Sequence, residues 1–497
     1  MKKSIFIASL SLISSVAFAQ DEYDALRFSQ TYQQGTARSI AMGGAFGALG
    51  GDISCLSSNP AGISIYKRGE FTFTPQFINC NSESNVNGFN ASDSKFSFKI
   101  ANIGFVQANY NADKNGFKGW AWGIAYNRLA DFNSKEYIYG PNDNTSMLDF
   151  FRNSSNGINP NNLIGNNIGA ALAYDCQLID DDGNNNYYNA HDEGWYQQTS
   201  SGYGELQKNK IKTKGGHNSW DFAFSGNVSD IFYFGASIGI ETLRYKSTNI
   251  YKEDASNLNH IEYNYWEYKR NFEINAAGIN LKTGIIVKPV NFLRFGAAIH
   301  TPTWFNMEDK FYATMKTEYK DGEYLSAMTE NDKYGYDPLI KYTIQTPFKA
   351  IASAAFIAPG VGLLSFDYEY VDYSLMKFET EDFEDDGYED VNSTIKDFYK
   401  PTHNFRLGGE VKVNPLVSLR AGYAIYGNPD KTIDRDFERQ IISGGIGFGD
   451  EDFFFDLTGS YHIYKTTKML YADQYADQFY NIKNKYLYIT MTFGVRF

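Results

Sequence analysis

Cysteine is scarce in this chain, and positive charge falls short of negative charge. Three cysteines, Cys55, Cys80 and Cys176, are spread over 497 residues. They form no metal-binding pattern, and at most one disulfide can join two of them. Lys and Arg number 45 against 58 Asp and Glu, which gives a formal net charge of -13. This balance disfavours a nucleic-acid partner.

Long apolar runs are missing as well. The run from Ile5 to Leu12 is too short to span a bilayer as a helix. It follows two lysines and precedes Ala17-Phe18-Ala19, so residues 1–19 are expected to be a signal peptide, with the mature chain beginning at Gln20. No cysteine follows that cleavage site, which argues against a lipid anchor.

Aromatic side chains are abundant. Tyr, Phe and Trp make up 17% of the residues, yet the mean hydropathy is only -0.43. Many aromatics and glycines at low hydropathy suit a membrane β-barrel, in which only every second residue of a strand touches lipid. A large secreted β-sandwich would share part of this composition.

Alternation favours the barrel. In the last segment, one parity carries apolar side chains up to the terminal Phe497, and the other carries mostly polar residues and glycine. Strands are predicted at 70–77, 96–110, 119–132, 218–229, 231–249, 263–287, 291–303, 339–358, 362–378, 403–414, 417–427, 439–449, 453–470 and 484–497. Short turns alternate with long polar links, such as 133–217 and 304–338, as in outer-membrane barrels. The fold class is therefore all-β, a transmembrane antiparallel barrel of 14 strands, with 12 or 16 as alternatives.

Residues 20–69 lack strand alternation and could fill part of the lumen of the barrel formed by residues 70–497. They contain Arg38, a Gly/Ala-rich segment from Gly43 and Gly44 to Gly51, then Asp52, then Asn59-Pro60-Ala61-Gly62. This order resembles the N-terminal hatch of the FadL/TodX family of outer-membrane transporters of hydrophobic compounds. The chain departs from that pattern in its additional residues, Gln20 to Gly35, before the motif.

The resemblance implies a monomeric barrel in the outer membrane that carries compounds such as long-chain fatty acids without an energy source. In that family the ligand lands on external loops and moves to an internal pocket. A change in the N-terminal hatch then releases it sideways through the wall. The residue types are compatible with this, because Pro60 fixes its own φ and the glycines allow close backbone packing. A purely structural plug is the alternative.

The link at 133–217 contains apolar residues at roughly helical spacing. They would form either a landing groove for an acyl chain or a cap over the barrel mouth: Leu148, Phe150, Phe151, Leu163, Ile164, Ile168 and Leu172. The segment from Asp180 to Asn186 lacks the alternation and the terminal Glu of a calcium loop. No metal or cofactor is expected.

Two arginines with lumen-facing parity, Arg406 and Arg420, could bind the carboxylate of a ligand. The alternative is that they pair with lumen carboxylates such as Glu410 and Asp456. A pocket lined by aromatic and aliphatic side chains is predicted near the hatch, with at least one cation within reach.

No enzyme is predicted. The six histidines form no His-x-x-x-His pair, and no Gly-x-Ser-x-Gly motif is present. A serine and histidine from separate strands, with His300 or His462 as candidates, would be the remaining hydrolase arrangement. The leading function is passive transport of a hydrophobic molecule. The rivals are a porin-like channel for polar solutes and a surface-binding protein that uses the barrel as an anchor.

Overall fold

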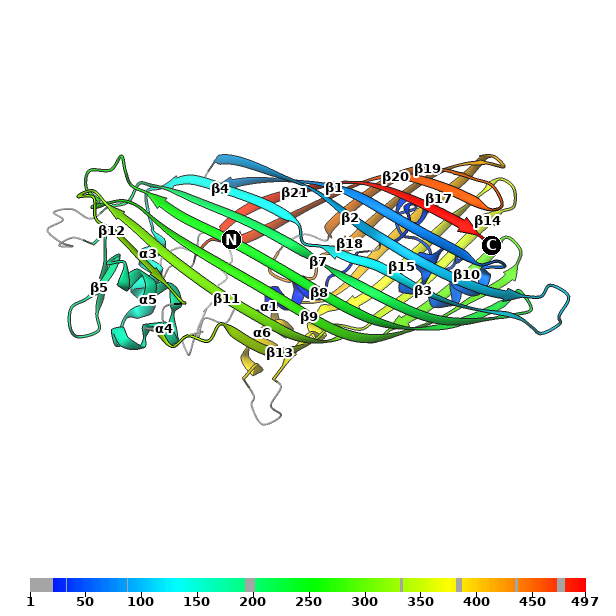
Figure 1. Ribbon diagram of the computed structural model, residues 1–497, viewed down its shortest axis with the longest axis horizontal. Coiled ribbons are helices and arrows are strands. Elements are labelled where there is room, and N and C mark those ends of the chain that lie inside the picture. Colours follow the sequence, from blue (N-terminus) through cyan, green and yellow to red (C-terminus); the bar gives the residue numbers. More distant parts are fainter. Residues whose placement is uncertain are drawn as a thin grey trace, which may run out of the picture.

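Long antiparallel strands form the wall of the molecule, and the first and last strands pair with each other. The computed structural model describes residues 21–32, 34–86, 88–192, 202–330, 334–380, 387–433, 437–471 and 479–497. The predicted signal peptide lies outside these residues. Pairing of Glu70 with Arg496 and of Phe73 with Phe493 joins the two ends of the sheet. The wall is therefore a closed barrel of 14 strands (Figure 1).

The wall strands are β1 (Glu70–Val86), β2 (Phe89–Tyr110), β3 (Phe117–Asp131) continued by β4 (Ser134–Asn142), β7 (Glu205–Val228), β8 (Phe232–Asp254), β9 (Tyr263–Val290), β10 (Leu293–His300) continued by β11 (Trp304–Tyr319), β13 (Leu339–Gln345) with β14 (Lys349–Ala358), β15 (Gly362–Asp372) with β16 (Lys377–Glu379), β17 (Pro401–Asn414), β18 (Val417–Gly427), β19 (Phe437–Gly449), β20 (Phe453–Met469) and β21 (Phe479–Arg496). Two of the interruptions, between β10 and β11 and between β13 and β14, contain Pro302 and Pro347. A proline has no N–H to give to a ladder, so it interrupts pairing there.

The remaining elements lie inside the barrel or at its outer end. They are α1 (Glu22–Ser29), α2 (Ala37–Ala41), η1 (Ile53–Ser57), η2 (Pro60–Ile65), α3 (Met147–Ser155), η3 (Pro160–Asn162), α4 (Leu163–Asn166), α5 (Ile168–Asp175), β5 (Ile179–Asp181), β6 (Tyr187–Asn189), β12 (Tyr324–Met328), η6 (Tyr373–Leu375) and α6 (Glu389–Phe398). None of the helices in the described ranges combines the length and the apolar character that crossing a membrane requires.

The predicted 14 strands and the hatch inside the lumen are confirmed. Two predicted links were wrong: 133–217 holds β4 and the start of β7, and 304–338 holds β11 and β12. These parts of the wall extend outward past the lipid-facing band of the barrel surface and face water on their outer side. Their outward positions are therefore polar, as in the Lys208 to Lys214 stretch of β7, and the apolar alternation that marks a lipid-facing strand is lost.

Lipid-facing side chains follow one parity of the strands. On β7, Trp220, Phe222 and Phe224 are exposed on the outer surface, whereas Ser219 and Asp221 between them are fully buried. The two-residue turn to β8 at Ser229 and Asp230 has positive φ at both residues, 59° and 56°. Such turns match the twist of paired strands, which explains how this link stays short.

The C-terminal residue completes the ring of strands. Phe497 follows β21 directly, and its backbone N–H donates to the Gly69 carbonyl at 3.0 Å, while Gly69 N–H donates to Phe497 at 2.9 Å. Its ring is 54% exposed on the outer surface and stacks on Phe105 with 5.8 Å between centroids. The predicted position of Phe497, at the end of the last strand and facing lipid, is confirmed.

Deleting Phe497 should lower the yield of assembled barrel, because it removes both hydrogen bonds to Gly69 and the ring that covers Phe105. Heat-modifiable mobility on a gel measures the folded fraction. The conservative replacement Phe497→Tyr should assemble like the unaltered protein. Equal folded fractions for the deletion and the unaltered chain would show that closure does not need this residue.

Candidate functional site

Residues 36–65, here called the hatch, rest on a wall that lacks side chains at the contact points. Gly408 and Gly422 are lumen-facing glycines on β17 and β18. A Cβ on Gly422 would lie 2.1 Å from the amide nitrogen of Gly43, and one on Gly408 would lie 2.3 Å from the Met42 carbonyl oxygen. Three further lumen-facing glycines are filled in the same way by hatch atoms: Gly235, Gly284 and Gly296. The hatch main chain therefore packs directly against the wall main chain.

Charged and polar side chains fix the hatch in this seat. Asp367 of β15 accepts hydrogen bonds from the N–H groups of Phe46 at 3.1 Å and Gly47 at 3.0 Å. The guanidinium of Arg38 binds Glu410 at 3.0 Å. Glu410 also binds Arg420 at 2.6 Å, so one wall carboxylate is shared by a hatch cation and a wall cation. These contacts join the hatch to the adjacent strands β15, β17 and β18 and resist its displacement.

The residues of the Asn-Pro-Ala motif form the contact between the hatch and β9. Asn59 donates to the carbonyl oxygens of Gly47 at 2.7 Å and Ile285 at 3.1 Å, and it accepts the N–H of Ala61 at 3.2 Å. Pro60 begins η2, the position where a missing N–H costs least. Asn59 therefore links one part of the hatch to another and both to the wall.

The other predicted hatch residues shape its backbone. Gly43 and Gly44 have φ of 64° and 77°, a conformation that favours glycine. Asp52 caps η1 through the Ser54 N–H at 2.9 Å and accepts the hydroxyl of Thr36 at 2.7 Å. Gly62 lies against Gly50, and a Cβ added to Gly62 would be 2.9 Å from the Cα of Gly50. The structure thus brings all the predicted hatch residues into one compact insert.

The segment before the hatch motif forms α1, which occupies the lumen farther out (Figure 1). Ala25 and Phe28 of α1 are fully buried in a belt of apolar wall side chains, here called the apolar belt. It includes Leu243, Ile274, Phe305, Met307, Tyr342 and Ile344. Phe28 meets Tyr245 edge to face at 5.9 Å and Phe132 at 6.2 Å. The additional N-terminal residues therefore fill the most apolar part of the lumen.

Between α1 and the hatch lies a polar cavity of about 50 Å³. That volume has room for only a few water molecules. Its charged and titratable lining residues are His217, Glu241, Lys282, His300, Lys349, Glu369 and Arg406. Several buried atoms of the lining have no hydrogen-bond partner among the described residues, including Ser29 Oγ, Ser58 Oγ, His217 Nδ1, Asn280 Oδ1, and Nε and Nη2 of Arg406. Polar groups in such surroundings bind water or the polar end of a ligand.

The pocket prediction is met in part: the cavity next to the hatch has the cations Lys282, Lys349 and Arg406 in its lining, but most of its lining residues are polar, and the aromatic and aliphatic side chains form the belt around α1. Arg420 pairs with Glu410 and with Asp456 at 2.5 Å, which is the alternative that the sequence left open. Arg406 binds Glu369 at 3.1 Å and reaches the polar cavity. Lumen parity identified both arginines but could not show which carboxylates face them.

One seam interrupts the hydrogen bonding of the wall. The ladder between β2 and β3 begins at Tyr110 and Gly119 and ends at Asn102 and Asn127. Farther out, residues 89–100 of β2 pair with β1, and β4 pairs with β7. The chain between β3 and β4 contains Phe132, which contacts Phe28 of α1. Helix α1 thus touches the wall where the neighbouring strands β2 and β4 are not hydrogen-bonded to each other.

The predicted landing residues lie in a small helical bundle at the outer mouth. Five of them are buried in the bundle core: Leu148, Phe151, Leu163, Ile168 and Leu172. Phe150 and Ile164 are half-buried at its edge. They pack on wall residues such as Trp266 and Met315 and leave no exposed apolar groove at these positions. This arrangement agrees with the alternative, a cap over the barrel mouth.

A buried carboxylate attaches this bundle to the wall. Glu253 of β8 accepts hydrogen bonds from the hydroxyl of Ser146 at 2.6 Å and the N–H of Met147 at 3.0 Å, at the beginning of α3. The indole of Trp266 also donates to Glu253, at 3.1 Å. The wall therefore caps the first helix of the bundle.

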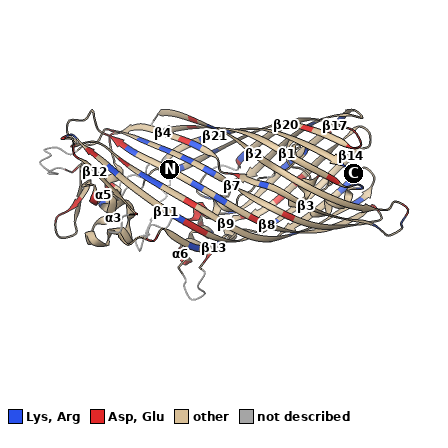
Figure 2. Ribbon diagram, in the orientation of Figure 1, with Lys and Arg blue, Asp and Glu red and all other residues tan. Residues whose placement is uncertain are grey.

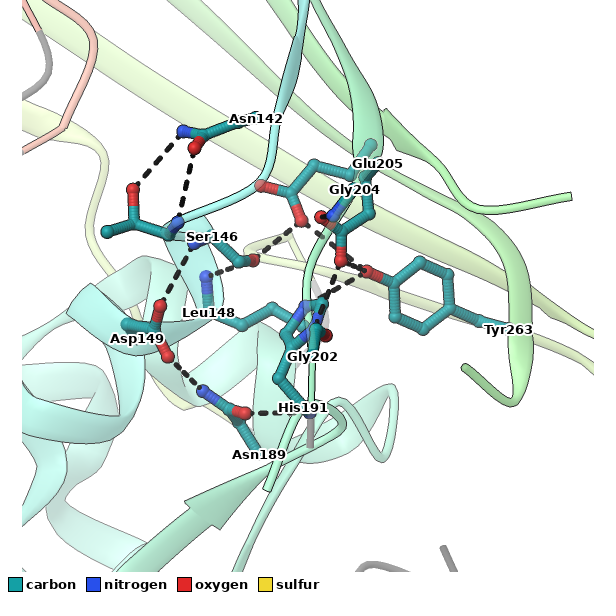
Figure 3. A network of polar contacts seen from close by, with 12 residues as sticks. Asn142, Ser146, Leu148, Asp149, Asn189, His191, Gly202, Gly204, Glu205 and Tyr263 are labelled. Atoms are coloured by element: carbon teal, nitrogen blue, oxygen red, sulfur yellow. Dashed lines mark hydrogen bonds and ion pairs between the residues drawn. The ribbon is translucent and has the colours of Figure 1, made fainter. Parts of the chain in front are cut away.

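His191 and Glu205 stand beside Glu253. Figure 3 shows His191, Glu205 and Tyr263 of this cluster pointing toward one another. The donor atoms of His191, Glu205 and Glu253 lie within 4.8 Å of one another, the one group among the described residues with spacing suited to a metal ion. His191 Nδ1 is 3.0 Å from Glu205 and 3.0 Å from the Gly202 carbonyl, and Nε2 is 3.2 Å from the Tyr263 hydroxyl. Both ring nitrogens are engaged by protein, so the cluster functions as an ion pair that closes the bundle.

Asp180 to Asn186 form the hairpin between β5 and β6, where Asp182 binds the backbone of Asn184 and Asn186. The cysteines Cys55, Cys80 and Cys176 are all buried and free. Of the two histidine candidates, His300 binds the Ser58 carbonyl at 2.7 Å, and His462 lies 3.2 Å from the Ser460 hydroxyl. In the described residues no carboxylate hydrogen-bonds either histidine, so the orienting third group of a hydrolase site is missing there.

The residues that sequence reasoning missed are the wall glycines. All five occupy lumen-facing positions in strands, where a glycine weakens a strand and often marks close approach of another backbone. Glycine at inward parity was therefore the available signal. It was hidden because the partner in each contact lies hundreds of residues earlier, in the hatch.

Gly422→Ala should loosen the hatch, since the new methyl group would overlap the Gly43 backbone. Overpacking of this kind costs about 1–3 kcal/mol. Hydrogen exchange of residues 41–47 should become faster. Gly444→Ala is the matched control on the next strand, because its Cβ would have 3.7 Å of clearance. Unchanged hydrogen-exchange protection of residues 41–47 in Gly422→Ala would show that close packing against this glycine does not hold the hatch.

Docking of the outer bundle should weaken as the pH rises. Burial alone would lower the pKa of His191, but Glu205 beside it raises the pKa to about 9. Burial and the nearby Glu205 charge raise the pKa of Glu253 to about 7. Both groups bind protons more tightly when docked. The Glu253 contribution is complete below pH 4.5 and is lost as the pH rises through 7. The His191 contribution is complete below pH 6.5 and is lost as the pH rises through 9.

Fluorescence of Trp266 measures this transition, with Trp266→Phe giving the background of the other tryptophans. Emission should shift to the red between pH 6 and pH 9.5 as the indole becomes exposed. Glu253→Gln should remove the lower step and keep the step of His191. The same emission at both pH values would contradict the assignment.

No protein-family model matches this sequence, and no curated protein matches it. Solved structures do. The toluene transporter TodX of P. putida superposes with a TM-score of 0.54 at 13% identity over 94% of this chain and 99% of that one. A Pseudomonas aeruginosa FadL homologue gives 0.53 at 12% identity, covering 93% and 98%. The Ralstonia pickettii toluene transporter TbuX gives 0.51 at 13%, covering 94% and 99%. The chain therefore has the fold of these three proteins, a closed 14-stranded antiparallel β-barrel with an N-terminal hatch.

Proposed function

We propose that this protein is a passive outer-membrane transporter of hydrophobic compounds that carry a polar group, such as long-chain fatty acids. The observation that carries the proposal is the arrangement of the lumen. An apolar belt holds α1, a polar cavity follows directly, and the seam in the wall lies beside both. A ligand with an apolar body and a polar end would replace the side chains of α1 in the belt and the water of the cavity.

The interior favours such a ligand over a sugar or an ion. Burial of apolar surface is worth about 25 cal/mol per Å², and the belt around Phe28 offers that surface. The belt meets the cavity at Phe305, whose ring lies edge to face on His217 at 5.4 Å. Lys349 and Arg406 supply positive charge in the cavity lining. The apolar belt and the charged cavity lining are thus in direct contact, through Phe305 and His217.

The seam offers a route out of the lumen that avoids the hatch. The hatch blocks the axial path with main chain packed on main chain. Opening between β2 and β4 breaks no interstrand ladder, because the β2–β3 pairing has already ended at Asn102. Movement of α1 would free Phe132 at the same place. The proposed release is therefore lateral, at the inner end of the seam between Asn102 and the outward-facing Phe98 of β2, with the N-terminal segment as the moving part.

A porin-like channel for polar solutes is the rival function, and the seated hatch argues against it. A barrel that serves only as an anchor for a binding surface is the second rival. The proposal also includes that the chain is not an enzyme and acts as a monomer without a cofactor. The solved proteins of this fold described above are transport channels, which supports the first point.

Closing the seam should stop transport. Asp93 on β2 and Lys135 on β4 face each other across it, with 3.9 Å between their charged atoms, and both are 39% exposed. In Asp93→Cys/Lys135→Cys, a cleavable bis-maleimide linker should reduce uptake of a labelled long-chain fatty acid into proteoliposomes about fivefold or more. Cleavage of the linker should restore uptake, because no other part of the protein is altered.

Thr467→Cys/Asn481→Cys is the matched control, since these residues are exposed partners on β20 and β21, away from the seam. The same linker should leave its uptake unchanged. Fatty acid uptake that persists with the seam linked would contradict lateral release. Passage of sugars through the unlinked protein, with no fatty acid bound, would replace the proposal with the porin function.

A further inference from the structure

The outer surface of β4, β7 and β8 carries a concentration of positive charge that the chain as a whole does not have. On β7, even-numbered residues face outward, because they share the parity of the lipid-facing Trp220 and Phe222. Lysine fills four successive outward positions farther out on this strand. Together with the outward cations of β4 and β8 they form the basic face: Lys135, Lys208, Lys210, Lys212, Lys214, Arg244, Lys246 and Lys252 (Figure 2).

The strand register places like charges directly opposite each other on this face. Lys214 pairs with Lys246 and Lys208 with Lys252 between β7 and β8. Lys212 is opposite Lys135 of β4. Like charges directly across a strand pair are destabilising. An arrangement of this kind is favourable when an anion from outside the chain lies between the cations.

Carboxylates of the protein neutralise only part of the basic face. Glu273 forms ion pairs with both Lys246, at 2.6 Å, and Arg244, at 3.7 Å. Asp254 likewise serves Lys208 at 3.1 Å and Lys252 at 3.6 Å. Across the described residues, Lys212 and Lys214 take part in no ion pair. The face therefore retains several unneutralised cations.

The neighbouring part of the wall at the same distance from the membrane is balanced. On β11, Lys316 is opposite Glu267 of β9, and Lys310 is opposite Glu273, the carboxylate that also contacts Lys246 and Arg244. Lys341 of β13 binds Glu308 at 3.5 Å. Exposure to water outside the membrane thus does not by itself produce an unpaired basic surface. The outward lysines of β11 and β13 named here thus face glutamates, whereas Lys212 and Lys214 of β7 are opposite lysines.

The basic face begins just outside the apolar belt of the outer surface. Ile240 is the last large apolar residue of β8 that faces lipid, and it is 46% exposed. Arg244 follows four residues later on the same face. At about 3.3 Å per residue and a strand tilt of about 40°, this is about 10 Å farther along the membrane normal. Lipid headgroups occupy that depth, and long cationic side chains reach toward them.

We propose that the basic face binds the phosphate groups of anionic lipid in the outer leaflet. Phosphate oxygens would bridge the opposed Lys214 and Lys246, the lysine pair of β7 and β8 nearer the membrane, with Arg244 as the guanidinium suited to bidentate contact. The basic face adjoins the seam, because β4 belongs to the basic face and is also the strand that borders the seam opposite β2. Bound lipid would therefore stand next to the proposed exit of the transported compound.

Native mass spectrometry of the full-length protein in detergent tests this with two lipids of identical acyl chains, phosphatidic acid and phosphatidylcholine. The triple variant Lys212→Gln/Lys214→Gln/Lys246→Gln should bind phosphatidic acid about tenfold more weakly than the unaltered protein. Its binding of phosphatidylcholine should be unchanged. Raising the salt concentration should weaken only the binding of phosphatidic acid.

The matched control is Lys310→Gln/Lys316→Gln/Lys341→Gln, which removes three outward lysines that lie opposite or bind glutamates. It should bind phosphatidic acid like the unaltered protein. Folding of both variants is checked by heat-modifiable mobility, and the first should fold well because it relieves repulsion. Retained binding in the first variant, or an equal loss in both, would overturn the proposal.

Discussion

Contact of main chain with main chain between the hatch and the wall is the constraint on which the rest of the structure depends. Five lumen-facing glycines remove the side chains that would otherwise keep the hatch away from the strands. Asp367, Glu410 and the motif residue Asn59 then fix it with hydrogen bonds and one shared ion pair. Since the axial path is filled by backbone, any molecule that passes through the lumen must displace the N-terminal segment or leave through the wall.

The parts of the lumen follow from that closure. With the hatch fixed at the end of the barrel that carries the short turns, the chain before it continues outward, and α1 fills the apolar belt. The linking residues between α1 and the hatch line the small polar cavity with the charged wall residues. Phe28 then reaches the seam at Phe132. The closed hatch and the filled belt are thus two consequences of one path of the N-terminal segment, and that path also brings Phe28 to the seam.

Sequence reasoning could predict what repeats along the chain. Alternation located the strands that face lipid on one side, and the Asn-Pro-Ala motif located the hatch. It could not predict the outward extensions of β4, β7 and β11, because strands that face water on their outer side carry no apolar parity. Nor could it predict the polar cavity, since His217, Lys282 and Arg406 come from strands far apart in the sequence. The buried positions of Leu148 and Phe151 likewise depend on wall residues that no local pattern shows.

A structure determined with a long-chain fatty acid bound tests the central claim most directly. The account predicts the acyl chain in the apolar belt where Phe28 of α1 now lies, and its carboxylate in the polar cavity. The hatch residues on Gly408 and Gly422 would keep the axial path closed. A continuous water-filled path from the outer mouth to the short turns, with the hatch displaced and no fatty acid in the belt, would contradict it.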